Sequence, residues 1–230
     1  MRIQLVVFDM AGTTIRDDDA VNRCLREALQ AEGINVTRDE VNAVMGIPKP
    51  VAIGALLSQA KLGGQSAPPG EVERLHADFL RRMIEFYRAD PGVAPMPGAQ
   101  ACLEQLKRAG IRIALDTGFS RNIVDVILDR LGWDLPGFLD ATVASDEVRR
   151  GRPHPDLLLE AMRRCGVDDV LCVAKVGDTP SDLLEGTHAG CALVVGVING
   201  THTRAQLEAH PHTHLLAHLT DLPPLVQAWA

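Results

Sequence analysis

The feature that most constrains the fold of this chain is a set of short apolar segments, rich in β-branched residues, that alternate with helical segments. These apolar segments cover residues 3–8, 111–115, 141–144, 170–176 and 193–198. Runs of four to eight apolar residues are typical of strands buried on both faces of a parallel sheet. The alternation therefore predicts an α/β core in which helices cover both faces of a doubly wound parallel sheet.

A second pattern interrupts this alternation after the first strand. From residue 17 to about residue 88 the chain shows only helical signals, among them Thr37 and Glu40, whose spacing is typical of a capping box. Residues 89–98 hold three prolines and two glycines, as a stiff linker does. We therefore expect an all-helical cap domain inserted into the core. The expected boundaries are residues 1–15 and 93–230 for the core and residues 16–92 for the cap.

Composition excludes several classes of protein. The chain has 230 residues, of which 46% are hydrophobic, so it can bury a core. A net charge of -7 and the lack of a basic run argue against a nucleic-acid partner. No apolar stretch approaches the ~18 residues of a membrane span, so we expect no membrane partner. Five scattered cysteines without a C-x-x-C pair indicate reduced thiols and a cytoplasmic location. The oligomeric state stays open, with a homodimer as the candidate assembly.

Polar residues follow three of the predicted strands. Asp9 follows the first strand, Thr117 the second and Asp178 a later one, while Asp182 lies in the first turn of the next helix. The carboxyl ends of parallel strands share one edge of a sheet, so these side chains should converge. Converging carboxylates repel each other unless a cation joins them, and oxygen ligands favour Mg²⁺ over zinc. The alternative is a helix cap at Asp182 and a turn at Asp178.

Four motifs in this order resemble the haloacid dehalogenase (HAD) superfamily over essentially the whole chain. They are Asp9-x-x-Gly12-Thr13, Thr117-Gly118, Gly151-Arg152-Pro153-x-Pro155 and Gly177-Asp178-x-x-x-Asp182. The segment Asp9-Met10-Ala11-Gly12-Thr13-Thr14 is most similar to phosphonoacetaldehyde hydrolases (phosphonatases) and phosphonatase-like hydrolases. The resemblance implies a Rossmann-like HAD core with the cap inserted after the first motif.

The resemblance also implies a role for each motif residue. Asp9 would be the nucleophile and form an aspartyl-phosphate. Thr117 would donate to the phosphoryl oxygens, and Arg152 would grip them in a bidentate manner. The implied Mg²⁺ ligands are Asp9, the backbone carbonyl of Ala11, Asp178 and Asp182. The implied substrate-binding residues are Gly12, Thr13, Met45, Gly118 and Arg152.

Ala11 departs from the pattern of most HAD phosphatases. Those enzymes carry a second Asp two residues after the nucleophile, which protonates the leaving oxygen and later activates water. A methyl side chain performs no acid–base chemistry. Either the leaving group needs no proton at this point, or another group supplies it.

Lys49 is a candidate for a different kind of catalysis. Cleavage of a P–C bond leaves a carbanion, for which phosphonatases provide an electron sink through a Schiff base on a cap lysine. Lys49 matches that lysine in its spacing after Met45, and lysine occurs only four times in the chain. A solvated surface lysine is the alternative. Two positions differ from the phosphonatase pattern: Ala52 replaces a histidine, and Phe119 replaces an aromatic residue with a hydroxyl.

Three functional hypotheses remain open. The first is a Mg²⁺-dependent phosphonatase that cleaves the P–C bond of a small phosphonate through Asp9 and Lys49. The second is a phosphatase of a small, phosphoglycolate-like phosphate monoester with the same nucleophile. The third is a metabolite-binding protein without turnover, against which the retained acidic and basic motif residues argue. In the first two cases the partner is a small organophosphate or phosphonate.

Two further features have simple explanations. Lys175 lies on a predicted strand, where we expect a neighbouring carboxylate to neutralise it. His210, His212 and His214 alternate as metal ligands on a strand would, but a solvated, proline-interrupted segment explains them better.

Overall fold

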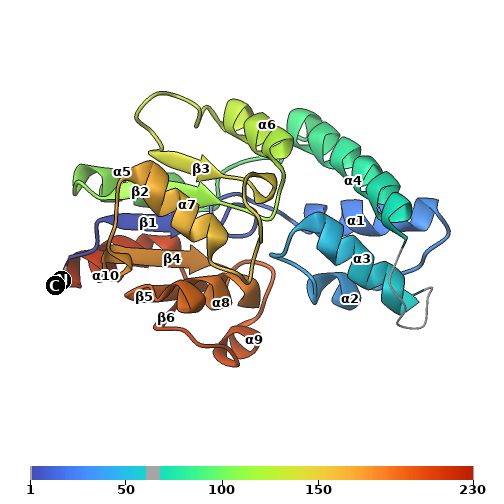
Figure 1. Cartoon of the computed structure of the whole chain (residues 1–230). Coiled ribbons are helices and arrows are strands. Elements are labelled where there is room, and N and C mark those ends of the chain that lie inside the picture. Colours follow the sequence, from blue (N-terminus) through green and yellow to red (C-terminus); the bar gives the residue numbers. More distant parts are fainter. Residues whose placement is uncertain (1, 61–67, 230) are drawn as a thin grey trace.

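Six parallel strands form a single sheet in the computed structural model, which describes residues 2–60 and 68–229 (Figure 1). Their order across the sheet is β3-β2-β1-β4-β5-β6, so the predicted doubly wound α/β fold is confirmed. The strands are β1 (Leu5–Phe8), β2 (Arg112–Asp116), β3 (Ala141–Val143), β4 (Val173–Gly177), β5 (Leu193–Val197) and β6 (His214–Leu216).

The helices fall into a group that flanks the sheet and a group that follows β1 in the chain. The flanking helices are α5 (Ala99–Arg108), α6 (Arg121–Leu131), α7 (Asp156–Cys165), α8 (Pro180–Ala189), α9 (Arg204–Glu208) and α10 (Leu222–Ala228). The others are α1 (Ala20–Ala31), α2 (Arg38–Asn42), α3 (Lys49–Ala60) and α4 (Pro69–Ala89), and they lie together beyond the arrowheads of the central strands (Figure 1). Short 3-10 turns are η1 (Ser145–Glu147), η2 (Val170–Cys172) and η3 (Leu219–Asp221).

Strand β1 shows why both faces of the sheet need helices. Its four residues are all fully buried and point alternately to the two faces. Val6 and Phe8 belong to the apolar cluster that includes α5 and α6, whereas Leu5 and Val7 belong to the cluster around α7. Parallel strands of this kind are stable only between two helical layers.

Helices α1 to α4, which we call the helical group, share one apolar cluster with the sheet and its flanking helices. Tyr87 of α4 packs edge-on against Phe119, with ring centroids 6.1 Å apart, and Phe79 and Met83 of the same helix are completely buried. Among the described residues between β1 and α5, every regular element is a helix. The predicted division into core and cap domains stays a prediction, and residues 61–67 of the predicted cap lie outside the described residues.

The structure differs from the sequence prediction at two strands. Residues 170–172 form the turn η2 rather than the start of a strand, because the Asp169 side chain accepts the N–H of Leu171. His214 belongs to β6, which the sequence analysis missed. This strand is short and only half-buried at the sheet edge, so it lacks the apolar run of the central strands. The expectation of a solvated segment was therefore wrong at His214.

Two predictions about the chain as a whole can be compared with the structure. All five cysteines carry free thiols, as predicted. In the part of the chain that the structure describes, none of the helices combines the length and the apolar character needed to cross a bilayer.

Neighbouring leucines on α7 provide a matched test of the core. Leu158 is completely buried under the sheet, whereas Leu159 is 46% exposed. We expect Leu158→Ala to lower the free energy of unfolding by about 2–5 kcal/mol, because it leaves a cavity. Leu159→Ala should change it by about 0.5 kcal/mol or less. Urea denaturation of both variants measures this difference, and equal losses would contradict the packing described for α7.

Candidate active site

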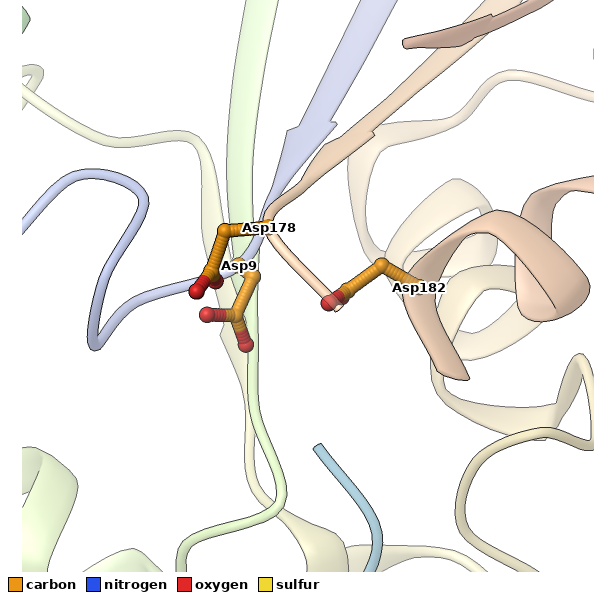
Figure 2. A group of neighbouring side chains, drawn as sticks. All are labelled: Asp9, Asp178 and Asp182. Atoms are coloured by element: carbon orange, nitrogen blue, oxygen red, sulfur yellow. The ribbon is translucent and has the colours of Figure 1, made fainter. Parts of the chain in front are cut away.

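The carboxyl ends of β1 and β4 bring the predicted carboxylates together. The two strands pair directly, and the Asp9 backbone N–H donates to the carbonyl of Val176 at 2.9 Å. Figure 2 shows Asp9 and Asp178 side by side at these strand ends, with Asp182 approaching from α8. One carboxylate oxygen from each lies within 4.8 Å of the others. The predicted convergence of the three residues is confirmed.

A small cavity of about 30 Å³ lies between these strand ends and the helical group. Six predicted site residues line it: Asp9, Ala11, Met45, Lys49, Thr117 and Gly118. Asp17, Val21, Gly46, Phe119, Thr179 and Thr201 complete its wall. The cavity therefore joins the predicted nucleophile to the predicted lysine, although 40 residues separate them in the chain.

Gly12 and Thr13 support the site from behind. The Thr13 hydroxyl donates to Asp178 Oδ1 at 3.0 Å, and the N–H of Thr201 donates to the other oxygen at 2.6 Å. Gly12 has a φ of +89°, and a Cβ there would come within 2.5 Å of Asp178 Oδ2. Both residues therefore hold Asp178 in place; direct contact of either with substrate stays a prediction.

Burial and mutual repulsion dominate the electrostatics of the carboxylates. Burial raises the pKa of Asp9 to about 8; Arg152 opposes this shift, and Asp182 and Asp178 add to it. Burial, together with the charge of Asp182, raises the pKa of Asp178 to about 6. A cation between Asp9 and Asp178 would relieve this repulsion.

Asp182 combines the two roles that the sequence analysis treated as alternatives. Its Oδ2 accepts the hydroxyl of Thr179 at 2.6 Å and the backbone N–H at 3.2 Å, which completes a capping box on α8. Its Oδ1 is buried without a hydrogen bond among the described residues, and it lies 2.9 Å from Arg152 Nη1. Helix capping thus aims the other oxygen at the site.

Arg152 is fully buried and uses each of its nitrogens within the protein. Nε donates to Glu185 at 2.8 Å, Nη1 donates to Asp9 Oδ1 at 2.5 Å, and Nη2 donates to Asp116. Burial opposes its charge, but these carboxylates raise the pKa of Arg152 well above its ordinary value. The bidentate grip on a phosphoryl group stays a prediction, because in this arrangement the guanidinium fork is engaged by Asp9, Asp116, Asp182 and Glu185.

Lys175 lies beside Arg152 and confirms the expectation of a neutralising carboxylate. Its Nζ lies 2.8 Å from Glu185 and 3.4 Å from Asp182, and it also donates to Asp116. Burial alone would raise the pKa of Asp116, but Arg152 and Lys175 hold it below its ordinary value. We refer to Asp9, Asp116, Asp178, Asp182 and Glu185 with Arg152 and Lys175 as the charge cluster.

Two members of the charge cluster were missed by the sequence analysis, although each had a signal. Asp116 directly precedes Thr117 at the end of β2. Glu185 follows Asp182 by three residues, a spacing that puts both on one face of α8. Burial, with the charge of Asp116, raises the pKa of Glu185 to about 7.

The residues present fit a divalent cation. Carboxylates outnumber cations in the charge cluster, and Asp182 Oδ1 is buried without a hydrogen-bond partner among the described residues. Asp9, Asp178 and Asp182 offer only oxygen ligands, and hard oxygen ligands match Mg²⁺.

Lys49 is a buried residue, so the alternative of a solvated surface lysine was wrong. Lys49 is the first residue of α3, and only 4% of it is exposed. Its Nζ lies 5.6 Å from the ring centroid of Phe119. Burial lowers the pKa of Lys49 to about 8, against the opposing charges of Asp9 and Asp17. Gly46 makes this possible: its φ is +81° and a Cβ would collide with Thr179, so the segment before α3 docks directly on the core.

Known proteins are similar to this chain in sequence and in architecture. A family model described as haloacid dehalogenase-like hydrolase matches residues 3–190. A phosphonoacetaldehyde hydrolase from Bacillus cereus (strain AH820) is 29% identical over 210 residues, which cover 87% of this chain and 78% of that protein.

Solved structures have the same fold. A phosphonoacetaldehyde hydrolase-like protein from Oleispira antarctica superposes with a TM-score of 0.85 at 22% identity, covering 98% of this chain and 92% of that one. A predicted phosphoglycolate phosphatase from Haemophilus somnus 129pt gives a TM-score of 0.82 at 20% identity, covering 99% of both chains. At these identities the likeness establishes the fold alone.

Lys175→Met tests the charge cluster. The change removes one of the two buried cations that contact Asp116 and Glu185 and leaves only Arg152 there, so we expect a loss of about 3–5 kcal/mol in the free energy of unfolding at neutral pH. The pKa of Glu185 is already raised to about 7, and without Lys175 it rises further. A carboxyl with a raised pKa in the folded state destabilises it as pH rises, so the loss should shrink on acidification to about pH 5.

The matched control is Lys107→Met, which removes a partly exposed ion pair of 3.1 Å with Asp140. It should cost about 1 kcal/mol or less at either pH. Urea denaturation at both pH values measures both variants. A loss for Lys175→Met that matches the control would show that the buried contacts contribute little.

Proposed function

Because the chain belongs to the haloacid dehalogenase-like hydrolases, we propose that it is a phosphonatase-like, Mg²⁺-dependent enzyme that cleaves the P–C bond of a small phosphonate such as phosphonoacetaldehyde. The single observation that carries this proposal is the buried Lys49 in the same small cavity as Asp9. A lysine that accepts the electrons of a breaking P–C bond must lie beside the nucleophile, and Lys49 lines the same cavity as Asp9.

Asp9 provides the nucleophile in this proposal. Arg152 holds its Oδ1, and the Thr14 hydroxyl donates to its backbone carbonyl at 2.9 Å, so the second oxygen is oriented for attack on phosphorus. Bound Mg²⁺ would be held by Asp9, Asp178, Asp182 and the Ala11 carbonyl, and it would neutralise the charge between nucleophile and phosphoryl group. The Thr117 hydroxyl at the cavity wall would donate to a phosphoryl oxygen.

Lys49 provides the electron sink. Its lowered pKa gives far more neutral amine near neutral pH than an ordinary lysine has, and a neutral amine attacks an aldehyde. Asp9 then attacks phosphorus, and the electrons of the P–C bond move into the iminium on Lys49. No proton needs to reach a leaving oxygen in this step, which agrees with a methyl group at Ala11.

A phosphate monoester is the second candidate substrate class. Lys49 is still largely protonated below its pKa of about 8, and its ammonium would pair with the carboxylate of a phosphoglycolate-like substrate. The ring of Phe119 and the methyl of Ala52 provide no acid at the positions where phosphonatases carry polar side chains. We rank this candidate second, because an alkoxide leaving group needs a proton that Ala11 does not supply.

Mg²⁺ should stabilise the protein in a pH-dependent way. The pKa values of Asp9 and Asp178 are raised to about 8 and about 6, so the metal-free protein loses stability as pH rises from about 4 to about 8. Mg²⁺ should offset this loss by about 2–3 kcal/mol at 100-fold its dissociation constant near pH 8, and by much less near pH 5. Thermal unfolding with and without EDTA measures the effect.

Asp178→Asn should abolish most of this stabilisation. Asp39→Asn removes the same charge from an exposed position on α2 and should retain it. Stabilisation by Mg²⁺ that survives in Asp178→Asn would exclude this residue as a ligand.

Lys49→Arg tests the Schiff base. The guanidinium keeps the positive charge but does not condense with an aldehyde, so phosphate release from phosphonoacetaldehyde should fall by at least about 100-fold. Borohydride added with phosphonoacetaldehyde should inactivate the wild type and modify Lys49, as mass spectrometry of the peptide would detect. Asp9→Asn should still be modified at Lys49 while releasing no phosphate.

A panel of phosphate monoesters completes the experiment. If the wild type hydrolyses a phosphoglycolate-like ester and leaves phosphonoacetaldehyde intact, the second candidate is correct. Normal P–C cleavage by Lys49→Arg would instead exclude the Schiff base at this residue.

A further inference from the structure

The active cavity needs an acid–base group that Ala11 does not provide. Imine formation, protonation of the departing carbon and hydrolysis of the imine each move a proton. Among the described residues that line the cavity, Asp17 is the carboxylate that the mechanism above leaves unused. It lies on the segment between β1 and α1, and the sequence analysis did not single it out as a site residue.

Asp17 lies at the junction of two cavities. Asp17 lines the active cavity of about 30 Å³ together with Lys49 and Asp9. A second, more polar cavity of about 170 Å³ also has Asp17 in its wall, and the two cavities share Met45 and Thr201. The larger cavity is roomy enough for several waters, whereas the smaller one has room for about one or two. A group at the junction can exchange protons with both.

The neighbouring aspartates are neutralised, but Asp17 is not. Asp18 pairs with Arg16 at 2.8 Å, and Asp19 pairs with Arg38 at 2.7 Å. For Asp17 no ion pair within 4.0 Å occurs among the residues described. Its Oδ1 accepts the backbone N–H of Val21 at 3.0 Å, which fixes the side chain at the start of α1. Its Oδ2 has no hydrogen-bond partner in the described part of the chain.

We propose that Asp17 is the acid–base residue of the active cavity, exchanging protons between the substrate carbon and oxygen held at Lys49 and the water of the larger cavity. The inference rests on the proposed function, because it assigns the proton transfers of that same reaction. It also explains how the chain works with a methyl group at Ala11.

The protonation properties of the two residues suit this exchange. Burial raises the pKa of Asp17 to about 6, although the Val21 N–H and the charge of Lys49 oppose the rise. The pKa of Lys49 is lowered to about 8, so proton transfer between the two groups is far less costly than for an ordinary carboxyl and amine. The other groups that face Asp17 are Asp18, Asp19, Cys24 and Tyr87, and those that face Lys49 are Asp9, Arg152 and His76.

The proton steps balance as follows. The neutral Lys49 amine adds to the aldehyde carbon, and the Asp17 carboxylate takes a proton from nitrogen. Asp17 returns this proton to the oxygen, which gives the carbinolamine. Protonated again from the water of the larger cavity, Asp17 donates a second proton to the same oxygen, so the C–O bond breaks, water leaves and an iminium forms. Asp9 attacks phosphorus, and the P–C electron pair forms an enamine. Asp17, protonated again from the larger cavity, donates to the enamine carbon.

Water completes the cycle. One water hydrolyses the new iminium to free Lys49 and the product aldehyde, and Asp17 takes up the proton released. A second water hydrolyses the aspartyl-phosphate on Asp9. The water lost on imine formation balances one of these, so the net reaction consumes one water and yields aldehyde and inorganic phosphate.

Asp17→Asn is the informative variant, because the amide oxygen still accepts the N–H of Val21 while the acid–base group is lost. Asp39→Asn is the charge-matched control on the exposed face of α2. The first measurement is competitive acetylation of Lys49 at a series of pH values, read by mass spectrometry in the full-length protein without substrate. Removal of the Asp17 charge should shift the reactivity profile of Lys49 to lower pH by about half a unit or more.

The second measurement is the rate at which cyanoborohydride traps phosphonoacetaldehyde on Lys49. We expect Asp17→Asn to reduce this rate by at least about 100-fold, because carbinolamine dehydration loses its acid. Formate should partly restore the rate to Asp17→Ala, since a small carboxylic acid can occupy the space that the side chain leaves. A merely structural role for Asp17 would give no rescue by formate. Asp39→Asn should match the wild type in both measurements.

The outcomes separate this inference from the proposed function. An unshifted acetylation profile, or trapping at the wild-type rate in Asp17→Asn, would overturn the role of Asp17. If the wild type itself is not trapped, the Schiff base fails, and Asp17 is then tested on esters. In that case Asp17→Asn should lose hydrolysis of an alkyl phosphate but retain that of p-nitrophenyl phosphate, whose leaving group needs no proton. Equal losses on both esters would overturn the inference.

Discussion

The interaction on which the rest of the structure depends is the buried contact of Arg152 and Lys175 with the carboxylates of the charge cluster. Arg152 reaches the ends of β1 and β2 and the first turns of α8, and it comes from the loop before α7. Isolated buried charges are very costly, so these segments are stable together only when the charges face each other. The cluster therefore fixes Asp9 at the strand edge and leaves an excess of negative charge that suits a cation.

The helical group contributes Lys49 to the cavity at this edge of the sheet. In the proposed function the core alone would provide the nucleophile Asp9 and the carboxylates that hold a cation. The close approach of Gly46 to Thr179 brings Lys49 into the cavity, and burial there lowers its pKa. The same arrangement leaves a cavity of only about 30 Å³ beside Asp9, so the proposed reaction would require the helical group to move as substrate enters and product leaves. The apolar contact of Tyr87 with Phe119 lies in that interface.

The sequence predicted correctly those elements whose burial leaves a run of apolar residues in the chain. The apolar strands and the residues that follow them predicted the sheet and the convergence of Asp9, Asp178 and Asp182. It failed at β6, whose half-buried edge position leaves no apolar run around His214. It also missed Glu185, because a single Glu on an amphipathic helix is far more often solvated than buried.

The sequence by itself predicted five of the six strands of the sheet, the family motifs and Asp9 as the candidate nucleophile, because those depend on residue type and spacing alone. Only the tertiary structure decided that Lys49 is buried beside Asp9, that the guanidinium of Arg152 is engaged by carboxylates, and that Asp17 is in the wall of two cavities. These facts depend on how α1 and α3 dock against the strand edge. Burial and the distance between charges then set the pKa of each group, and neither quantity can be read from the order of residues along the chain.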